Sequence, residues 1–503
     1  MKEKYVSTRG GVNNISASEG IVRGIASDGG LFVPSFIHDL KLDLTQMKDM
    51  TYGEMASAIF KLFLDDFDTE QIETCIHNAY YTGKFEESEP VCVKQAGGRW
   101  FLELYHGPTC AFKDMALTIL PHFMTTAMKN CSLDKEVVIL TATSGDTGKA
   151  ALAGFANVDG ISIVVYYPKD GVSTIQEKQM LTQEGANTCV IGVHGNFDDT
   201  QSGVKAILND TDLTQALSDK GYVFSSANSI NIGRLLPQVV YYVYSYLQLV
   251  NEGAVALGDP VNFVVPTGNF GNILAGYYAK ILGLPVGKLI CASNSNNVLT
   301  DFFATGEYNR NRDFYKTISP SMDILISSNL ERLLYELADG DTTVIADLMQ
   351  SLKDKGSYTL PETLRSHPDA SLFYGGYATE AETAVAIRNF FNAAHYLMDP
   401  HTAVANKVYD DYRAATGDTT PSIILSTASP YKFGHSVYES IYGTVPEGID
   451  DYAVLNLLSE KTGTVIPSPL KDLDQKPNQH QRVCTTSDMA DCITDFLTQK
   501  GEK

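Results

Sequence analysis

Lys113 is the first residue whose position could support covalent chemistry. It closes the segment HGPTCAFK, residues 106–113, which joins a rigid turn to what reads as the start of a helix. The positive end of a helix dipole disfavours an ammonium group, so a lysine at this place tends toward the free amine that reacts with an aldehyde. Taken alone, the pattern also fits a surface lysine, because most lysines are solvated.

Two glycine-containing loops follow strand patterns further along the chain. Residues 141–148 read TATSGDTG, and residues 266–272 read PTGNFGN. In each loop, polar side chains and backbone N–H groups precede a helix, an arrangement that binds carboxylates and phosphates. Neither has the GK[ST] element of a P-loop or the GxGxxG spacing of a dinucleotide site. A tight strand-to-helix turn is an equal alternative for both.

Residues 227–234, which read ANSINIGR, form another polar segment before a helix. Asn228, Ser229 and Arg234 offer an amide, a hydroxyl and a guanidinium group. The planar fork of arginine donors suits a doubly charged phosphate. On this segment alone the simpler interpretation is a polar surface loop, because loops are normally polar.

Other catalytic classes find less support. His401, in the segment DPHT of residues 399–402, could serve as a base, but a turn or helix-capping histidine fits its position better. The chain lacks the GxSxG and HExxH motifs of serine hydrolases and zinc proteases. Its eight cysteines form no CxxC pair and no cluster with histidine at metal spacing, so we expect reduced thiols and no metal site.

The elements that must position these loops alternate between strand and helix. Apolar strands are predicted at 137–141, 161–167, 189–193, 261–265, 289–292 and 422–425, with helices at 149–156, 173–183 and 273–281. Short, wholly apolar strands are typical of parallel sheets covered by helices on both faces. The fold class is therefore α/β with mainly parallel sheets, in which ligands gather at the carboxyl ends of the strands.

We expect three domains. Residues 1–90 form a small, mostly helical N-terminal domain, where Met55, Ile59, Leu62 and Phe63 have helical spacing. Residues 131–249 form a small α/β domain, and residues 91–130 together with 250–503 form a large one. Within the large domain, residues 462–482 are rich in Pro, Lys, Asp and Gln, which predicts a surface excursion before a last helix near 489–499.

Charge and hydropathy exclude several kinds of partner. The net charge of the 503 residues is -22, which disfavours nucleic acid and anionic membrane surfaces as partners. The nearest approach to the roughly 20 apolar residues of a membrane helix is 239–250, which is short and interrupted by tyrosines. Residues 1–11 have no apolar signal core. We therefore expect a cytoplasmic protein, as a monomer or a homodimer.

Taken together and in this order, the motifs resemble the threonine synthase family, in its bacterial and fungal branch. These are fold type II enzymes that carry pyridoxal 5′-phosphate (PLP), similar to the tryptophan synthase β chain. The resemblance begins with STRG at residues 7–10 and IASDGGLFVP at residues 25–34. It continues through the four segments described above and ends with STASPYKF at residues 426–433.

The resemblance implies a role for each motif. Lys113 would hold PLP covalently in the large domain and then act as the acid–base. Asp146 would lie near the 3′-oxygen of the cofactor, where many relatives have asparagine and where a carboxylate needs a proton or cation beside it. The resemblance further implies that the cofactor phosphate would be bound by Gly268, Asn269, Phe270, Gly271 and Asn272, and the pyridine nitrogen by Thr427. The substrate carboxylate would be bound by Thr143, Ser144 and Thr147. The substrate phosphate would be bound by Asn228, Ser229 and Arg234.

The implied activity is that of a carbon–oxygen lyase acting on a phosphate ester. It would convert O-phospho-L-homoserine and water to L-threonine and phosphate, the last step of threonine biosynthesis. A related phospholyase that does not complete the water addition, a fold type II serine or threonine dehydratase, and a binding protein without activity are the alternatives. A dehydratase substrate carries no phosphate, so Asn228, Ser229 and Arg234 would have no purpose there.

Overall fold

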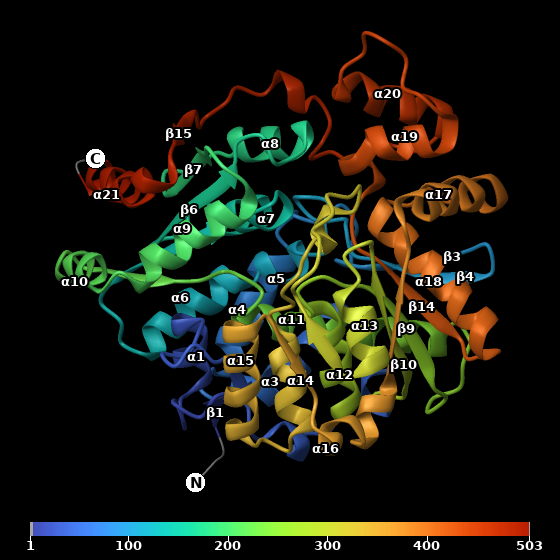
Figure 1. The fold of residues 1–503 in the computed structure, drawn as a ribbon, viewed down its shortest axis with the longest axis horizontal. Helices are drawn as coiled ribbons and strands as arrows, with labels where there is room; N and C mark the ends of the chain where they lie inside the picture. The colour runs from blue at the N-terminus through green and yellow to red at the C-terminus, as the bar shows by residue number, and fades with distance from the viewer. Residues whose placement is uncertain (1–3, 502–503) are drawn as a thin grey trace.

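Most strands belong to two separate sheets, one at the right and one at the upper left of Figure 1. The structure is a computed structural model and describes residues 4–501. The larger sheet contains β3 (Cys92–Ala96), β4 (Arg99–Glu103), β9 (Val261–Pro266), β10 (Val286–Ser293), β13 (Phe373–Tyr377) and β14 (Ser422–Ser426). They lie in the order β13-β10-β9-β14-β4-β3, and every pairing is parallel except the β3–β4 hairpin.

The smaller sheet is wholly parallel. Its strands are β5 (Glu136–Ala142), β6 (Ile161–Pro168), β7 (Thr188–Val193), β8 (Tyr222–Ser225) and β15 (Arg482–Cys484), in the order β15-β7-β6-β5-β8. Every residue of β6 is buried. The central strand is buried and mostly apolar because α7 (Asp146–Phe155) and α9 (Phe197–Asn209) both pack against it.

The larger sheet separates two hydrophobic cores. Phe263 and Val265 of β9 join the core that includes α11 (Ile232–Asn251), whereas Val264 joins the core that includes α18 (Pro400–Thr416). This alternation follows from the two-residue period of a strand. The sheet is thus covered on both faces, which explains why residues 261–265 are buried and, apart from Asn262, apolar.

Helix α11 is buried along almost its whole length. It packs against α3 (Tyr52–Phe63), α5 (Asp114–Leu117) and α12 (Gly271–Ile281). The apolar stretch at 239–250 therefore belongs to a core helix that joins the N-terminal part to the larger sheet. Among the described residues, no helix has the length and apolarity needed to cross a membrane.

The N-terminal part is mostly helical, as predicted. Its helices are α1 (Ala17–Arg23), α2 (Leu44–Met47), α3 and α4 (Thr69–Tyr80), with the short antiparallel pair β1 (Tyr5–Ser7) and β2 (Phe32–Pro34). Met55, Ile59 and Phe63 on α3 are fully buried, so the helical spacing of these positions does define a core-facing stripe.

The strands and helices expected after residue 130 are all present, with ends that differ by a few residues. In α8 (Thr174–Leu181) the capping box of Ser173 and Gln176 is confirmed. The remaining helices are α6 (Leu120–Asn130), α10 (Thr211–Asp219), α13 (Val298–Thr305), α14 (Leu330–Leu337), α15 (Thr342–Lys355), α16 (Glu362–Arg365), α17 (Glu380–Ala394), α19 (Gly434–Tyr442), α20 (Asp451–Thr462) and α21 (Met489–Gly501).

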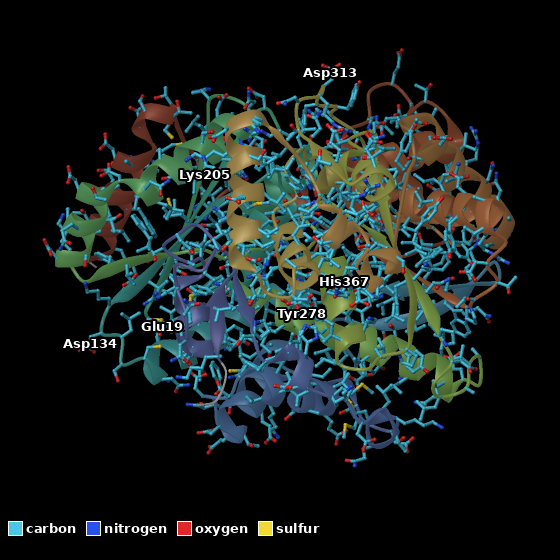
Figure 2. The ribbon with its side chains drawn as sticks, turned by 60° about the horizontal axis from the view of Figure 1, so that its bottom comes forward. Glu19, Asp134, Lys205, Tyr278, Asp313 and His367 are labelled. Atoms are coloured by element: carbon cyan, nitrogen blue, oxygen red, sulfur yellow. The ribbon has the colours of Figure 1, made fainter. Side chains whose placement is uncertain are left out.

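Short 3-10 turns and one small strand pair complete the chain. The turns are η1 (Ile37–Asp39), η2 (Pro320–Met322), η3 (Pro368–Leu372), η4 (Pro430–Phe433), η5 (Leu473–Gln475) and η6 (Thr486–Asp488), and the pair is β11 (Glu307–Asn309) with β12 (Ser357–Thr359). Figure 2 shows the buried Tyr278 of α12 toward the middle of the molecule, while Asp134 and Asp313 project at its edges.

We propose that the two sheets mark the two α/β domains expected from the sequence. Strands β5 to β8 come from residues 131–249, and the larger sheet draws on the remaining α/β segments. The last strand and helix differ from the expectation. β15 pairs with β7, and α21 packs against α9, so residues 482–501 join the smaller domain in this proposal.

Candidate active site

Lys113 occupies the N-cap position of α5, at the end of a tightly bonded turn. Thr109 donates to the Asp114 carboxylate through its backbone N–H at 2.8 Å and through its hydroxyl at 2.6 Å. A β-carbon on Gly107 would lie 2.7 Å from the Asp114 side chain, so only glycine fits there. The backbone under Lys113 is therefore held rigidly, as its sequence predicts.

The Lys113 amine lies among polar groups in the interior. Its Nζ donates to the Ser321 hydroxyl at 3.1 Å and lies 3.6 Å from Asp146 Oδ2. Burial lowers the pKa of Lys113 to about 8, although the nearby Asp146 carboxylate acts in the opposite direction. Near neutral pH this amine can therefore both accept and release a proton.

Asp146, the first residue of α7, is a buried carboxylate with several partners. Lys432 Nζ lies 2.7 Å from its Oδ1, and Gln176 Nε2 donates to the same oxygen at 3.0 Å. Burial alone would raise the pKa of Asp146, but Lys432 and Lys113 hold it well below its usual range. The carboxylate is thus charged, and Lys432 is the cation that the sequence interpretation of Asp146 requires.

The loop between β9 and α12 is shaped to receive an anion. Phe270 has a left-handed backbone (φ of 62°), which turns the chain sharply into the N-terminus of α12. The Asn272 side-chain oxygen accepts hydrogen bonds from Tyr241 and Tyr242, at 2.7 and 2.9 Å. Its buried Nδ2 has no hydrogen-bond partner within residues 4–501, so it remains available as a donor.

Glycine is required at the tip of this loop. A β-carbon on Gly268 would lie 2.5 Å from the Ser321 carbonyl oxygen. Asn329 fixes the loop from the other side, because its backbone N–H and its side-chain amide both donate to the Asn269 carbonyl, at 3.1 and 2.9 Å. The segment containing η2 and the start of α14 therefore encloses the loop.

Arg234 adds a buried cation beside this loop. Its Nη1 donates to the Ala227 carbonyl at 2.8 Å, and burial lowers its pKa to about 10. Its Nε is buried without a hydrogen-bond partner in the described part of the chain. The two predicted anion sites adjoin, because a β-carbon on Gly271 would lie 3.8 Å from Ser229 Cβ.

The loop after β5 has a defined internal geometry. The Thr143 hydroxyl oxygen accepts from the backbone N–H groups of Gly145 and Gly148, at 3.0 and 2.9 Å. Within residues 4–501 its hydroxyl hydrogen has no acceptor, so it can donate to a ligand. Ser144 and Thr147 are half-buried at the start of α7, next to Asp146. The oxygen of Thr143 thus shapes the loop, a function that the sequence does not reveal.

Thr427 lies beside the turn that carries Lys113. It directly follows β14, and its carbonyl accepts from the Phe112 backbone N–H at 2.8 Å. Ala111 and Ala428 form an isolated antiparallel bridge. The structure therefore brings Lys113, Asp146 and Thr427 together, with the loop of residues 268–272 and Arg234 around them.

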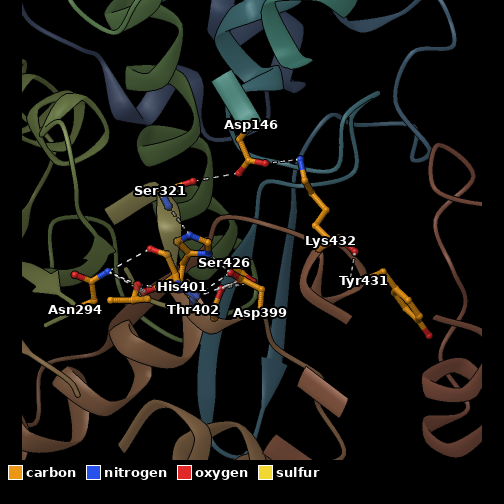
Figure 3. Close-up of polar contacts among 12 residues, drawn as sticks. Asp146, Asn294, Ser321, Asp399, His401, Thr402, Ser426, Tyr431 and Lys432 are labelled. Carbon is orange, nitrogen blue, oxygen red and sulfur yellow. Dashed lines mark hydrogen bonds and ion pairs between the residues drawn. The ribbon is translucent and has the colours of Figure 1, made fainter. Parts of the chain in front are cut away.

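Two neighbours of the predicted site were missed in the sequence. Lys432 had a possible signal, since a lysine in the otherwise apolar segment PYKF of η4 is out of place unless it is paired. Ser321, which contacts both Lys113 and Asp146, lies in a segment with no recognisable motif. Figure 3 shows Asp146 between Ser321 and Lys432.

His401 was expected in a capping turn, and it is there. Asp399 is the N-cap of α18 and accepts from the His401 backbone N–H at 2.9 Å. The His401 ring has a further contact, since its Nε2 accepts from the backbone N–H of Ser321 at 3.1 Å. The histidine therefore reaches the site through Ser321.

Comparison with known families matches almost the whole chain. Residues 4–80 match the family described as threonine synthase N terminus. Residues 93–426 match the pyridoxal-phosphate dependent enzymes, and residues 402–493 match the family described as threonine synthase, C-terminal.

Individual relatives carry two different names. The chain is 40% identical over 442 residues to "Threonine synthase-like 1" of Homo sapiens, a match that covers 84% of this chain and 58% of the human protein. It is 35% identical over 486 residues to the threonine synthase of Pseudomonas aeruginosa, covering 95% of this chain and 98% of that protein.

The fold has the same relatives. The crystal structure of PLP-bound threonine synthase from Brucella melitensis superimposes with a TM-score of 0.85 at 35% identity, covering 99% of both chains. The rigid lysine turn provides an amine for an aldehyde, and the glycine-containing loop before α12, with the unpartnered Nδ2 of Asn272 within residues 4–501, provides donors for a phosphate, so the residues present fit PLP. The chain belongs to the threonine synthase family of pyridoxal-phosphate dependent enzymes.

Proposed function

We propose that this chain converts O-phospho-L-homoserine and water to L-threonine and phosphate. The observation that carries the proposal is the placement of two anion-binding features beside one acid–base amine. Arg234 is a buried guanidinium whose Nε has no hydrogen-bond partner among the described residues, and it adjoins the separate loop of residues 268–272. One phosphate belongs to the cofactor, and the second site suits a substrate that carries its own.

Particular residues would hold the cofactor. Lys113 would bind it covalently, residues 268–272 would bind its phosphate, and Thr427 would face its ring nitrogen. Asp146, neutralised by Lys432, would lie near its phenolic oxygen. When bound, PLP supplies an electron sink that stabilises negative charge on the substrate carbons. The remaining work falls to the side chains of this protein.

Lys113 is suited to repeated proton transfer. With a pKa of about 8, its amine can take a proton from the substrate Cα and later return one to carbon. Loss of a proton from Cβ accompanies departure of phosphate from Cγ. A proton is then added at Cγ and water at Cβ, which gives the methyl and hydroxyl groups of threonine.

Two groups of side chains would orient the substrate. The hydroxyls of Thr143, Ser144 and Thr147 lie at or near the N-terminus of α7 and suit the substrate carboxylate. Asn228, Ser229 and Arg234 would bind the leaving phosphate. Because Arg234 is buried, its hydrogen bonds to an anion would be strong, on the order of 1.5–3 kcal/mol each.

A phospholyase is the second candidate, and one observation favours it. The human relative that shares 40% identity is named threonine synthase-like 1, and this chain spans 58% of its length. A phospholyase would release phosphate from the same substrate but would give 2-oxobutyrate in place of threonine. Its binding residues would be the same, so only the products separate the two candidates.

The test is to supply O-phosphohomoserine to the purified holoenzyme and to measure phosphate, threonine and 2-oxobutyrate together. Equal amounts of phosphate and threonine are expected. In D₂O the threonine methyl group should gain deuterium, because a solvent-derived proton is added at Cγ. Phosphate with 2-oxobutyrate alone would identify the phospholyase, and no phosphate release would overturn both candidates.

We also propose that the protein acts in the cytoplasm as a monomer or homodimer. The net charge of -22 and the eight free cysteines support this setting. Cell fractionation with immunodetection tests the location. Light scattering after size-exclusion chromatography tests the assembly, and a mass above that of two chains would contradict the proposal.

A further inference from the structure

We propose that Ser321 is a further catalytic residue, whose hydroxyl orients the Lys113 amine, and that Asp399 and His401 are positioning residues that act through it. The proposal deepens the proposed function and rests on Lys113 as the acid–base of that reaction. Ser321 lies in η2, a segment outside every motif described above.

The Ser321 hydroxyl bridges the two charged groups of the site. It accepts from Lys113 Nζ at 3.1 Å and donates to Asp146 Oδ2 at 3.2 Å. Because Lys113 Nζ and Asp146 Oδ2 are 3.6 Å apart, the hydroxyl completes a small triangle of polar atoms. A lysine side chain has several rotatable bonds, so two fixed partners restrict where its Nζ can lie.

The Asp399–His401 pair fixes the backbone of Ser321. His401 Nδ1 lies 2.6 Å from Asp399 Oδ1, and Nε2 accepts the Ser321 N–H at 3.1 Å. A ring nitrogen that accepts carries no proton, so Nδ1 carries the proton and donates it to Asp399. Both residues are almost fully buried. The carboxylate thus selects the one neutral tautomer that can hold Ser321.

The Asp399 end of the Asp399–His401 pair is also held by hydrogen bonds. Thr402 donates its hydroxyl to Asp399 Oδ2, and the Thr402 and Ser426 hydroxyls lie 3.1 Å apart. Figure 3 shows this chain of contacts leading from Ser426 to Ser321. Ser426 precedes Thr427, so the same network joins the end of β14 to η2. A buried, fully bonded network of this kind gives a rigid support.

A second anchor holds the segment around Ser321. The Asn294 side-chain amide donates to the Thr317 hydroxyl at 2.9 Å, to the Ser319 carbonyl at 3.2 Å and to Asp323 Oδ1 at 2.7 Å. The residues on both sides of Ser321 are therefore fixed from β10, and His401 fixes Ser321 itself from α18.

The chemical role follows from the proton balance at Lys113. When Nζ takes a proton from the substrate Cα it becomes an ammonium group with three N–H bonds. Ser321 accepts one of them and passes no proton on, while its own hydroxyl remains bonded to Asp146. Nζ then returns a proton to a substrate carbon. Ser321 therefore keeps the ammonium group aimed between the two transfers.

Ser321→Ala tests the hydroxyl alone, because it leaves the backbone N–H on His401. We expect kcat to fall about 10-fold or more, with KM changed less than about threefold. In the apoprotein, the rate at which added PLP develops its visible absorption at Lys113 should fall about fivefold or more. The final cofactor content should match the wild type. Ser321→Thr, which restores a hydroxyl, should recover most of both rates.

Ser319→Ala is the matched control. Ser319 lies in the same segment as Ser321, and its hydroxyl accepts from Asn294. Within residues 4–501 that hydroxyl makes no hydrogen bond to Lys113, and the Ser319 carbonyl that also accepts from Asn294 remains in place. Both rates should stay within about twofold of the wild type. Unchanged rates in Ser321→Ala would overturn the proposal. A loss of bound cofactor equal to the loss of rate would overturn it too, since that indicates a structural role.

A double-mutant cycle tests the positioning residues. In the wild-type background, His401→Gln should slow both turnover and the capture of PLP by the apoprotein. In Ser321→Ala it should have no further effect, because the histidine acts through Ser321. Asp399→Asn provides the same comparison with a smaller change in shape. If the effect of His401→Gln or Asp399→Asn adds in full to that of Ser321→Ala, the Asp399–His401 pair acts independently of Ser321, and that part of the proposal is overturned.

Failure of the proposed reaction can be distinguished from failure of the role proposed for Ser321. The rate of PLP capture uses no amino-acid substrate, so it reports on Lys113 and Ser321 even where O-phosphohomoserine is not the substrate. A wild type that releases no phosphate, together with a slow capture in Ser321→Ala, would reject the proposed reaction and retain the role of Ser321 at Lys113.

Discussion

Lys432 Nζ lies 2.7 Å from Asp146 Oδ1, and both side chains are sealed from solvent. Lys432 also donates to the Thr109 carbonyl at 2.8 Å, so it joins η4 to the turn before Lys113. A buried charge is tolerated when it is paired and hydrogen-bonded, and removing one member leaves the other uncompensated. The ion pair between Lys432 and Asp146 is therefore tested by substituting each residue separately.

Lys432→Met should lower the free energy of unfolding of the apoprotein by about 3–5 kcal/mol. Adding Asp146→Asn should recover much of the loss, because an uncharged amide needs no cation beside it. Urea unfolding of the wild type, both single variants and the double variant measures the coupling. A cost below about 1 kcal/mol for Lys432→Met would contradict a buried charged pair.

The reaction of Lys113 with PLP should depend on pH. Only the neutral amine attacks an aldehyde, and burial lowers the pKa of Lys113 to about 8. The rate of PLP capture by the apoprotein should therefore rise with pH through about 8 and become constant above it. Asp146 favours the ammonium form, so Asp146→Asn should move the midpoint to lower pH. A midpoint near the ordinary lysine value would contradict the burial seen here.

Arg234→Leu should lower kcat/KM for O-phosphohomoserine by roughly 10- to 100-fold or more, because it removes charge-assisted hydrogen bonds to the leaving phosphate. Arg234→Lys should recover part of the loss, since it keeps the charge without the two-pronged geometry. Inorganic phosphate should inhibit the wild type competitively and the Leu variant much less.

Cofactor content is the control for Arg234. It should stay near normal, because residues 268–272 hold the cofactor phosphate. Arg388→Leu, at an exposed position of α17, should leave both kcat/KM and phosphate inhibition unchanged. A Leu variant at position 234 that loses PLP but keeps its phosphate inhibition would show that the two phosphate sites are exchanged.

Thr427→Asp should harm threonine formation more than PLP binding. A neutral hydroxyl leaves the ring nitrogen largely unprotonated, whereas a carboxylate would protonate it and change where negative charge accumulates. Thr427→Ser, which keeps the hydroxyl, should behave as the wild type. Measurement of kcat, product ratio and cofactor content in the same preparations separates the effects. Unchanged kcat with an unchanged product ratio in the Asp variant would contradict this role.

The predicted loops were accessible from the sequence because each lies where a short apolar strand ends. β4, β9 and β14 are parallel neighbours, so their carboxyl ends place Lys113, residues 268–272 and Thr427 at one edge of the larger sheet. Periodicity located β9 and β14 but not β4, and the order of motifs assigned the family.

Ser321 and Lys432 could not be located in this way. Each is brought to Asp146 by tertiary packing, from segments with no strand or helix period of their own, the turns η2 and η4. The parallel pairing of β15 with β7 was also missed. A strand of three residues with mostly exposed side chains has no local hydrophobic pattern to identify it.

The placement of β15 affects the order in which the protein is completed during synthesis. β7 has its inner edge paired with β6 as soon as the nearby residues emerge, but its outer edge waits for β15, which follows the whole larger sheet in the chain. An open parallel edge is a surface for pairing with other chains. The nascent protein must therefore carry an unfinished sheet through most of its translation, and residues 482–484 are what finally shield it.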